Sequence, residues 1–146
     1  MTIFLGADHR GFELKKALID WLLANGFEVK DQGADQFLDN DDFVEYAVNV
    51  GEKVSKDKAA KGIVICGSGA GVEIAANKVK AIRCSLGQSV EQITKAREAD
   101  DINVLAIASD FTDSQKAKDL VETFLKTSFI PNENHLRRIE KINNIE

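Results

Sequence analysis

A cysteine followed by a glycine-rich segment is the part of this sequence that most directly indicates chemistry. Residues 63–65 form a short apolar run, typical of a strand buried on both faces of a parallel sheet, and Cys66 follows at its carboxyl end. Gly67, Gly69 and Gly71 allow backbone conformations in which successive N–H groups point into one concavity. Such a concavity suits an oxyanion or a phosphate and favours the charged form of a neighbouring thiol. The segment therefore predicts a reactive thiol beside an anion cradle.

Simpler interpretations of the same segment stay open on the residues alone. A glycine-rich turn between a strand and a helix is common in α/β proteins, and a buried cysteine is more often a small hydrophobe than a catalyst. Two anion-binding motifs are excluded. A P-loop needs Lys and Ser or Thr after its glycines, and a Cys-x5-Arg phosphatase loop needs arginine where Val72 stands. Nucleotide binding and phosphoester hydrolysis are therefore not indicated.

Length and charge narrow the class of protein and of partner. The chain has 146 residues, which fits one domain spanning residues 1–146. Its net charge of −5 argues against nucleic acid or an anionic membrane as the partner, and favours a small metabolite. No apolar stretch approaches the ~20 residues that span a bilayer, and the amino terminus carries no targeting segment, so we expect a cytoplasmic protein. Cys66 and Cys84, each expected to follow a buried strand, lack metal-type spacing and are predicted to be free thiols; neither a metal nor a cofactor is expected.

Strands and helices are predicted to alternate along the chain. Apolar runs predict strands at 3–5, 27–29, 63–65, 82–84 and 104–107. Helical spacing of apolar residues predicts helices around 14–22, 44–54, 72–78, 90–99, 117–125 and 136–142, and an acid-rich loop is expected between 31 and 42. This alternation predicts a Rossmann-like α/β fold, a three-layer sandwich around a five-stranded parallel sheet. Ligands of such sheets bind beyond the carboxyl ends of the strands, where Asp8, His9 and Cys66 are expected.

The last amphipathic segment has little left to pack on within its own subunit. After Pro131, apolar residues recur every three positions at Leu136, Ile139 and Ile142. An apolar helix face without an internal partner marks a contact with another chain. We therefore predict a homodimer or a dimer of dimers in which this C-terminal helix packs on the partner subunit.

The cysteine segment also carries a resemblance to a known family. Residues 62–78, G-I-V-I-C-G-S-G-A-G-V-E-I-A-A-N-K, closely resemble the signature of the ribose-5-phosphate isomerase B and galactose-6-phosphate isomerase family. Weaker agreement, notable for its order along the chain, continues at 6–15, at Asp42 with Phe43 and Tyr46, at 103–106 and at 135–138. The resemblance covers nearly the whole chain.

The resemblance implies an aldose–ketose isomerase of the ribose 5-phosphate/ribulose 5-phosphate type that works through a cis-enediolate without metal. Similar proteins use the residue matching Cys66 as the base that moves a proton between C1 and C2, and the hydroxyl matching Ser68 in ring opening. The loop matching Gly67, Gly69, Ala70 and Gly71 holds the enediolate oxygen. These roles agree with the thiol and cradle inferred from the residues.

The resemblance further implies a set of substrate-binding residues: Asp8, His9, Asp100, Asn103, His135 and Arg138. In the family, the arginine matching Arg138 binds phosphate and often reaches the site of the neighbouring subunit. Three of these residues also have a simpler structural interpretation. Asp8 is also a good helix N-cap, His9 a turn residue, and Arg138 a solvated cation favoured by the helix dipole.

Three departures from the family pattern concern the substrate. Ala99 stands where ribose-5-phosphate isomerases carry the histidine that protonates the ring oxygen, and Asp110 and Asn134 stand where arginines are usual. The lost cations predict weak binding of D-ribose 5-phosphate unless Arg10 or another cation replaces them. Two alternatives to a homomeric isomerase follow: one subunit of a heteromeric galactose-6-phosphate-type isomerase with a related second chain, or a non-catalytic sugar-phosphate-binding protein.

Overall fold

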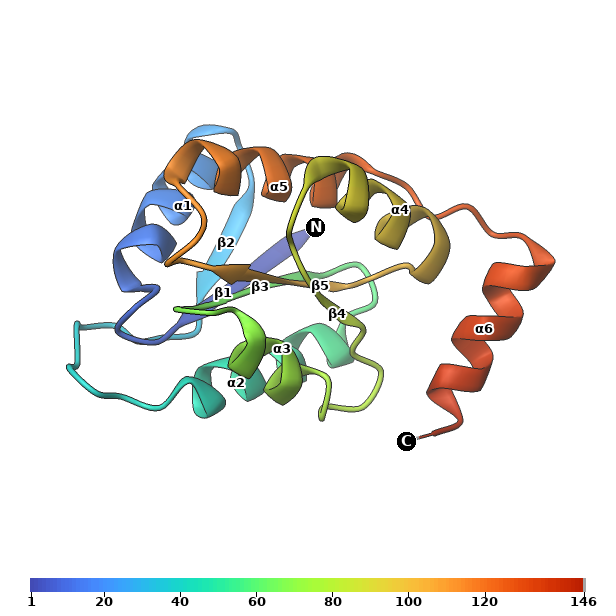
Figure 1. The fold of residues 1–146 in the computed structure, drawn as a ribbon, viewed down its shortest axis with the longest axis horizontal. Helices are drawn as coiled ribbons and strands as arrows, with labels where there is room; N and C mark the ends of the chain where they lie inside the picture. Colours follow the sequence, from blue (N-terminus) through green and yellow to red (C-terminus); the bar gives the residue numbers. More distant parts are fainter. Residues whose placement is uncertain (146) are drawn as a thin grey trace.

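A five-stranded parallel sheet lies between two layers of helices in the computed structural model, which describes residues 1–145 (Figure 1). The strands are β1 (Thr2–Ala7), β2 (Glu28–Asp31), β3 (Lys61–Cys66), β4 (Cys84–Leu86) and β5 (Val104–Ala108). The helices are α1 (Phe12–Ala24), α2 (Phe43–Lys56), α3 (Ala70–Ala76), α4 (Val90–Asp100), α5 (Ser114–Lys126) and α6 (Glu133–Asn143). The predicted Rossmann-like three-layer fold is confirmed.

The order of the strands creates a crevice at the carboxyl edge of the sheet. The order is β2-β1-β3-β5-β4, with every neighbouring pair parallel. The chain passes from β1 outward to β2 and then returns to β3 on the other side of β1, so the topological switch point lies between β1 and β3. Asp8 follows β1 and Cys66 ends β3, and the Asp8 N–H donates to the Ile65 carbonyl at 3.3 Å. The predicted position of both residues is confirmed.

Alternation along β3 decides which way the thiol points. Ile63 and Ile65 pack in the hydrophobic cluster formed with α1, α4 and α5. Val64 and Cys66 belong to the cluster on the opposite face, with α2 and α3. The register that pairs Cys66 with Ala108 of β5 is held by these two buried faces, because a slip of one residue would exchange them. Cys66 is thereby directed toward the α2–α3 side.

The predicted strand at 82–84 is misplaced. Ile82 is buried, but it lies in the turn before β4, where Ala81 has a φ of 65° and the Arg83 N–H donates to Asn103 Oδ1 at 2.8 Å. Its apolar side chain fills the core without belonging to a ladder. Cys84 therefore begins a strand instead of following one. Other shifts are small: β2 extends to Asp31 and α3 begins at Ala70.

The C-terminal helix lies apart from the three layers, beyond the β4 side of the sheet (Figure 1). Within Glu133–Asn143 no residue is buried, and Leu136 and Ile142 are 52% and 40% exposed. This is the unpartnered apolar face that the sequence predicts. No helix within residues 1–145, α6 included, is long and apolar enough to cross a membrane.

Candidate active site

A pocket of about 420 Å³ opens at the carboxyl edge of the sheet beside the thiol. It is lined by Asp8, Arg10, Phe43, Cys66, Gly67, Ser68, Gly71 and Asp110. A larger hollow of about 650 Å³ lies between residues 31–38 and Tyr46, and it is lined by carboxylates and amides without a nucleophile. The smaller pocket is the candidate active site because it joins the switch point of the sheet to Cys66.

The glycine-rich loop is shaped by close approaches that only glycine allows. Gly69 has a φ of +73°, and a Cβ there would collide with Leu86. A Cβ on Gly71 would lie 2.6 Å from the Phe43 ring. The Cys66 thiol is free and the residue is 4% exposed, while the exposed Ser68 accepts a hydrogen bond on Oγ from Ala70 N–H at 3.3 Å. The predicted sequence of strand, thiol and tight turn is therefore present.

Asp8 is buried, lines this pocket and holds the turn that precedes α1. Its Oδ1 accepts hydrogen bonds from the backbone N–H groups of Arg10 at 3.0 Å and Gly11 at 3.2 Å. Burial raises the pKa of Asp8, opposed by the hydrogen bond from Gly11, the positive charge on His9 and the hydrogen bond from Arg10. The alternative of a helix N-cap is not realised in this form, because Gly11 is the N-cap of α1 and Asp8 binds the turn before it.

His9 is oriented by a carboxylate that sequence reasoning missed. Asp41 Oδ1 accepts the His9 N–H at 2.8 Å and lies 2.8 Å from the ring Nδ1. The hydrogen bond with Asp41 raises the pKa of His9. Burial raises the pKa of Asp41, but the hydrogen bonds from His9 and Tyr46 together with the positive charge on His9 outweigh burial and lower that pKa. Nothing in the spacing of the acid run at 39–42 distinguishes Asp41 from its neighbours.

The same residues are the group within 1–145 that could offer ligands to a metal ion. Potential ligand atoms of Asp8, His9 and Asp41 lie within 4.8 Å of one another. Two backbone amides already occupy Asp8 Oδ1, and the His9 ring is hydrogen-bonded to Asp41. The group is a buried carboxyl group beside a hydrogen-bonded His–Asp pair.

The His9–Asp41 pair predicts a measurable titration shift. Asp41→Asn removes the carboxylate that raises the pKa of His9, so the His9 pKa should fall toward its ordinary value of 6.5. The raised His9 pKa contributes stability that is present below the unfolded-state pKa and lost as pH rises through the folded-state value. The lowered Asp41 pKa contributes stability that is lost as pH falls through that value. NMR titration of the His9 ring in both proteins measures the shift; an unchanged His9 pKa in the variant would contradict the pairing.

An ion pair closes one corner of the pocket. Arg10 Nε lies 3.3 Å from Asp110 Oδ1, and Arg10 Nη2 donates to Asp110 Oδ2. The two side chains meet over Gly67, where a Cβ would collide with Arg10 and lie 2.9 Å from Asp110 Oδ2. An arginine is therefore present near the carboxyl end of β5, as the sequence left open, but it comes from the β1 side and is paired with a carboxylate.

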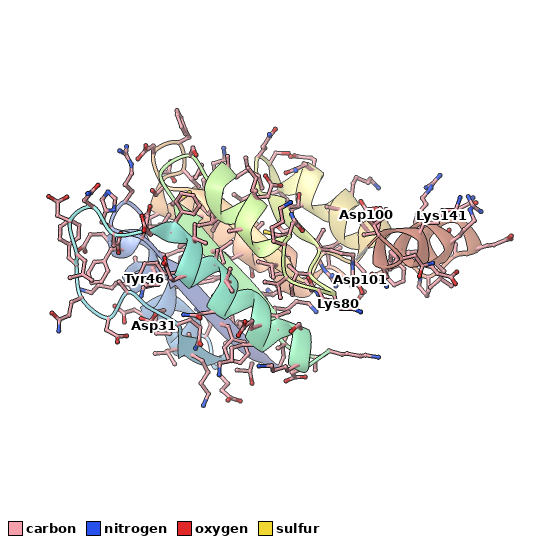
Figure 2. The ribbon with its side chains drawn as sticks, turned by 90° about the horizontal axis from the view of Figure 1, so that it is seen from below. Asp31, Tyr46, Lys80, Asp100, Asp101 and Lys141 are labelled. Carbon is pink, nitrogen blue, oxygen red and sulfur yellow. The ribbon has the colours of Figure 1, made fainter. Side chains whose placement is uncertain are left out.

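Asp100 and Asn103 do not reach this pocket within one chain. Asn103 precedes β5 at the amino edge of the sheet, where its Nδ2 donates to the Ala81 carbonyl at 2.9 Å. Asp100 is the last residue of α4, and its carbonyl accepts from Arg83 Nε at 2.9 Å. Figure 2 shows Asp100 and Asp101 beside α6, toward the opposite end of the molecule from Tyr46.

His135 and Arg138 lie on the detached α6. The His135 Nδ1 lies 2.8 Å from the Ile130 carbonyl, and Arg138 is exposed. The structure thus joins Asp8, Cys66, Gly67, Ser68 and Gly71 in one pocket, with His9 next to Asp8 and with Gly69 and Ala70 forming the turn behind. The residues of the α4–β5 turn and of α6 are not joined to it in a single chain.

Comparison with known proteins agrees with this architecture. A family model described as "Ribose/Galactose Isomerase" matches residues 3–142. The chain belongs to the ribose/galactose isomerase family. A member from Mycoplasma genitalium, named a probable ribose-5-phosphate isomerase B, is 43% identical over 97% of this chain and 93% of its own length. The ribose-5-phosphate isomerase B of Mycobacterium tuberculosis is 36% identical over 96% of this chain and 86% of its own.

Solved structures of family members superpose closely. The crystal structure of ribose-5-phosphate isomerase B from Mycoplasma genitalium with bound ribulose 5-phosphate gives a TM-score of 0.94 at 39% identity, covering 99% of this chain and 95% of that one. The enzyme from Clostridium thermocellum gives 0.95 at 36% identity, covering 99% and 97%. The family resemblance predicted from the cysteine segment is confirmed.

Proposed function

We propose that this chain is an aldose–ketose isomerase of a sugar phosphate, with Cys66 as the base that transfers the proton. The observation that carries the proposal is the placement of Cys66, at the carboxyl end of β3, at the switch point of the sheet and directly before the glycine-rich turn. Family membership supports it, since the Mycoplasma genitalium member was crystallised with ribulose 5-phosphate.

The proposed reaction needs a base that moves a proton between C2 and C1, and N–H groups that stabilise the negative charge that develops on oxygen. The Cys66 thiolate removes the proton from C2 of the open-chain aldose, and the electrons move to the carbonyl at C1 to form a cis-enediolate. Backbone N–H groups of residues 67–71 stabilise the developing oxyanion, a contribution worth about 10²- to 10³-fold in rate for one donor elsewhere. The thiol returns the proton to C1 while a hydroxyl proton passes from O2 to O1, which yields the ketose. Ser68 assists ring opening, and Asp8 and His9 bind substrate hydroxyl groups.

A substrate screen tests this proposal directly. Pentose and hexose phosphates, together with the free sugars, are incubated with the protein, and aldose–ketose conversion is measured. We expect conversion of a sugar phosphate, including open-chain aldoses that need no ring opening. Binding without any conversion would instead favour the sugar-phosphate-binding protein, an alternative motivated by Ala99 and Asp110.

A second chain is needed to bring the remaining predicted residues to the pocket. Asp100, Asn103, His135 and Arg138 lie at the amino edge of the sheet and on α6, both of them away from the pocket of their own chain. We propose a homodimer or a dimer of dimers in which these residues face the pocket of the partner. In a heteromeric isomerase, a related second subunit would supply these residues to the pocket instead of an identical one. A cytoplasmic location stays a prediction from the sequence.

The exposed face of α6 predicts the oligomeric state. Leu136 and Ile142 are largely exposed apolar residues outside the core clusters of their own subunit, so we expect a dimer or tetramer by light scattering at micromolar concentration. Leu136→Glu with Ile142→Glu should shift the protein toward the monomer without unfolding it, since neither side chain belongs to the core. A wild-type protein that is monomeric at this concentration would contradict the assembly.

A further inference from the structure

We propose that the Arg10–Asp110 ion pair determines substrate specificity: it binds a hydroxyl-bearing part of the sugar and excludes phosphate from the corner of the pocket above Gly67. The inference rests on the proposed isomerase function and specifies which end of a substrate this corner accepts. It concerns two residues that line the pocket with Cys66, of which Asp110 departs from the family pattern.

The backbone that carries the pair is tied together at the carboxyl edge of the sheet. Arg10 follows β1 and Asp110 follows β5, and these strands flank β3 on its two sides. The Asp110 N–H donates to the Gly67 carbonyl at 3.0 Å. Ser109 Oγ lies 2.9 Å from the Arg10 carbonyl and 3.2 Å from the Cys66 carbonyl, which ties the three strand ends together. These hydrogen bonds fix the strand ends that carry the two residues, while the Arg10 and Asp110 side chains that meet over Gly67 remain 54% and 35% exposed.

The carboxylate occupies the part of the guanidinium that a phosphate would use. Arg10 meets Asp110 through Nε and Nη2, a side-by-side arrangement of the kind with which arginine grips a carboxylate or a phosphate. A phosphate dianion entering this corner has to displace Asp110 or accept its negative charge at close range. Asp110 thus acts as an anion already bound to Arg10.

The charge of the pocket adds to this exclusion. Its lining contains two carboxyl groups, Asp8 and Asp110, and one guanidinium, Arg10, so the acidic side chains outnumber the basic one. A sugar hydroxyl group carries no charge and can both accept and donate hydrogen bonds. It can accept one from the remaining N–H groups of Arg10 and donate one to a carboxylate oxygen of Asp110. The corner therefore favours an uncharged polyol segment, and the substrate class is a sugar phosphate whose phosphate group extends past this corner.

Inorganic phosphate is the probe that tests the exclusion without any need for turnover. Calorimetric titration with phosphate is compared for the wild type, Asp110→Asn and the double variant Arg10→Met with Asp110→Asn. We expect Asp110→Asn to bind phosphate at least tenfold more tightly than the wild type, and the double variant to lose that gain. Asp119→Asn, the same change at an exposed position on α5, is the matched control and should leave binding unchanged. Asp110→Ser provides a second variant, and thermal melting verifies that each protein is folded.

Kinetics with a converted substrate supply the second readout. In Asp110→Asn the KM for a phosphorylated aldose that wild type converts poorly should fall, while the KM for its unphosphorylated counterpart should not. The inference is overturned if removal of Asp110 leaves phosphate binding unchanged or weaker, or if the gain survives the loss of Arg10. A protein that converts no sugar would refute the proposed function, whereas the phosphate titrations would still decide the role of the pair.

Discussion

Replacing Cys66 with alanine is expected to abolish isomerase turnover while leaving the fold intact. The thiol is the proposed base, and general acid–base catalysis contributes roughly 10²- to 10⁴-fold to rates. Loss of the group that both removes and returns the proton should reach or exceed the upper part of that range. The structural change is small, because alanine keeps the Cβ in the α2–α3 cluster and β3 keeps its ladder to β1 and β5. Steady-state rates and thermal melting measure the two effects separately.

Cys84→Ala is the matched control for this experiment. Both cysteines are free, buried and part of the same hydrophobic cluster, so each substitution deletes one sulfur atom from a similar environment. Burial raises the pKa of the Cys84 thiol, which keeps it protonated and unreactive. It begins β4, outside the pocket. Activity should therefore barely change in Cys84→Ala, and equal residual rates in the two variants would remove Cys66 from its role.

Residues 62–78 could be interpreted from sequence because local pattern and chemistry coincide there. The apolar run at 63–65, the thiol and the glycines follow one another along the chain, and each constraint is visible in the order of residues. The alternation of strands and helices then fixed the sheet, since a parallel sheet brings Asp8 and Cys66 to one edge wherever they lie in the chain. The short edge strand β4 was predicted two residues too early because the apolar Ile82 is buried without being part of the strand. The types of residue alone do not show which of them form the backbone hydrogen bonds of a strand.

The parts of the site that sequence could not predict depend on partners distant in the chain. Asp41 orients His9 across 32 positions, and Arg10 pairs with Asp110 across 100 positions. The sequence indicated Arg10 only as a cation that could replace a missing one. It indicated Asp110 only as an aspartate at a position where the family usually has arginine. Only the geometry over Gly67 shows that Asp110, a departure from the family pattern, forms an ion pair with Arg10, so that its negative charge is compensated within the pocket.

Restoring the cations of the family pattern is expected to give the second large effect, a gain in affinity for D-ribose 5-phosphate. Asp110→Arg removes the carboxylate bound to Arg10 and adds a guanidinium, so two arginines would face the corner above Gly67. Asn134→Arg adds a further cation on α6, which would face the partner's pocket in the proposed assembly. Each charge-assisted hydrogen bond to phosphate contributes on the order of 1.5–3 kcal/mol, which corresponds to roughly 10- to 150-fold in binding.

The KM of the double variant for D-ribose 5-phosphate should therefore fall by at least tenfold relative to wild type. Addition of Ala99→His should then raise turnover of the cyclic sugar in particular, because it restores a group able to protonate the ring oxygen, and should leave an open-chain aldose unaffected. Asp119→Arg with Asn134→Arg carries the same total charge but adds no cation at the corner and leaves the Arg10–Asp110 pair in place, so it serves as the control for net charge. The reasoning fails if the unmodified protein converts D-ribose 5-phosphate efficiently with a KM in the usual range of about 1 μM to 1 mM. That result would mean that the Arg10–Asp110 pair opens to accept phosphate, and that charge balance in the unliganded pocket does not set the specificity.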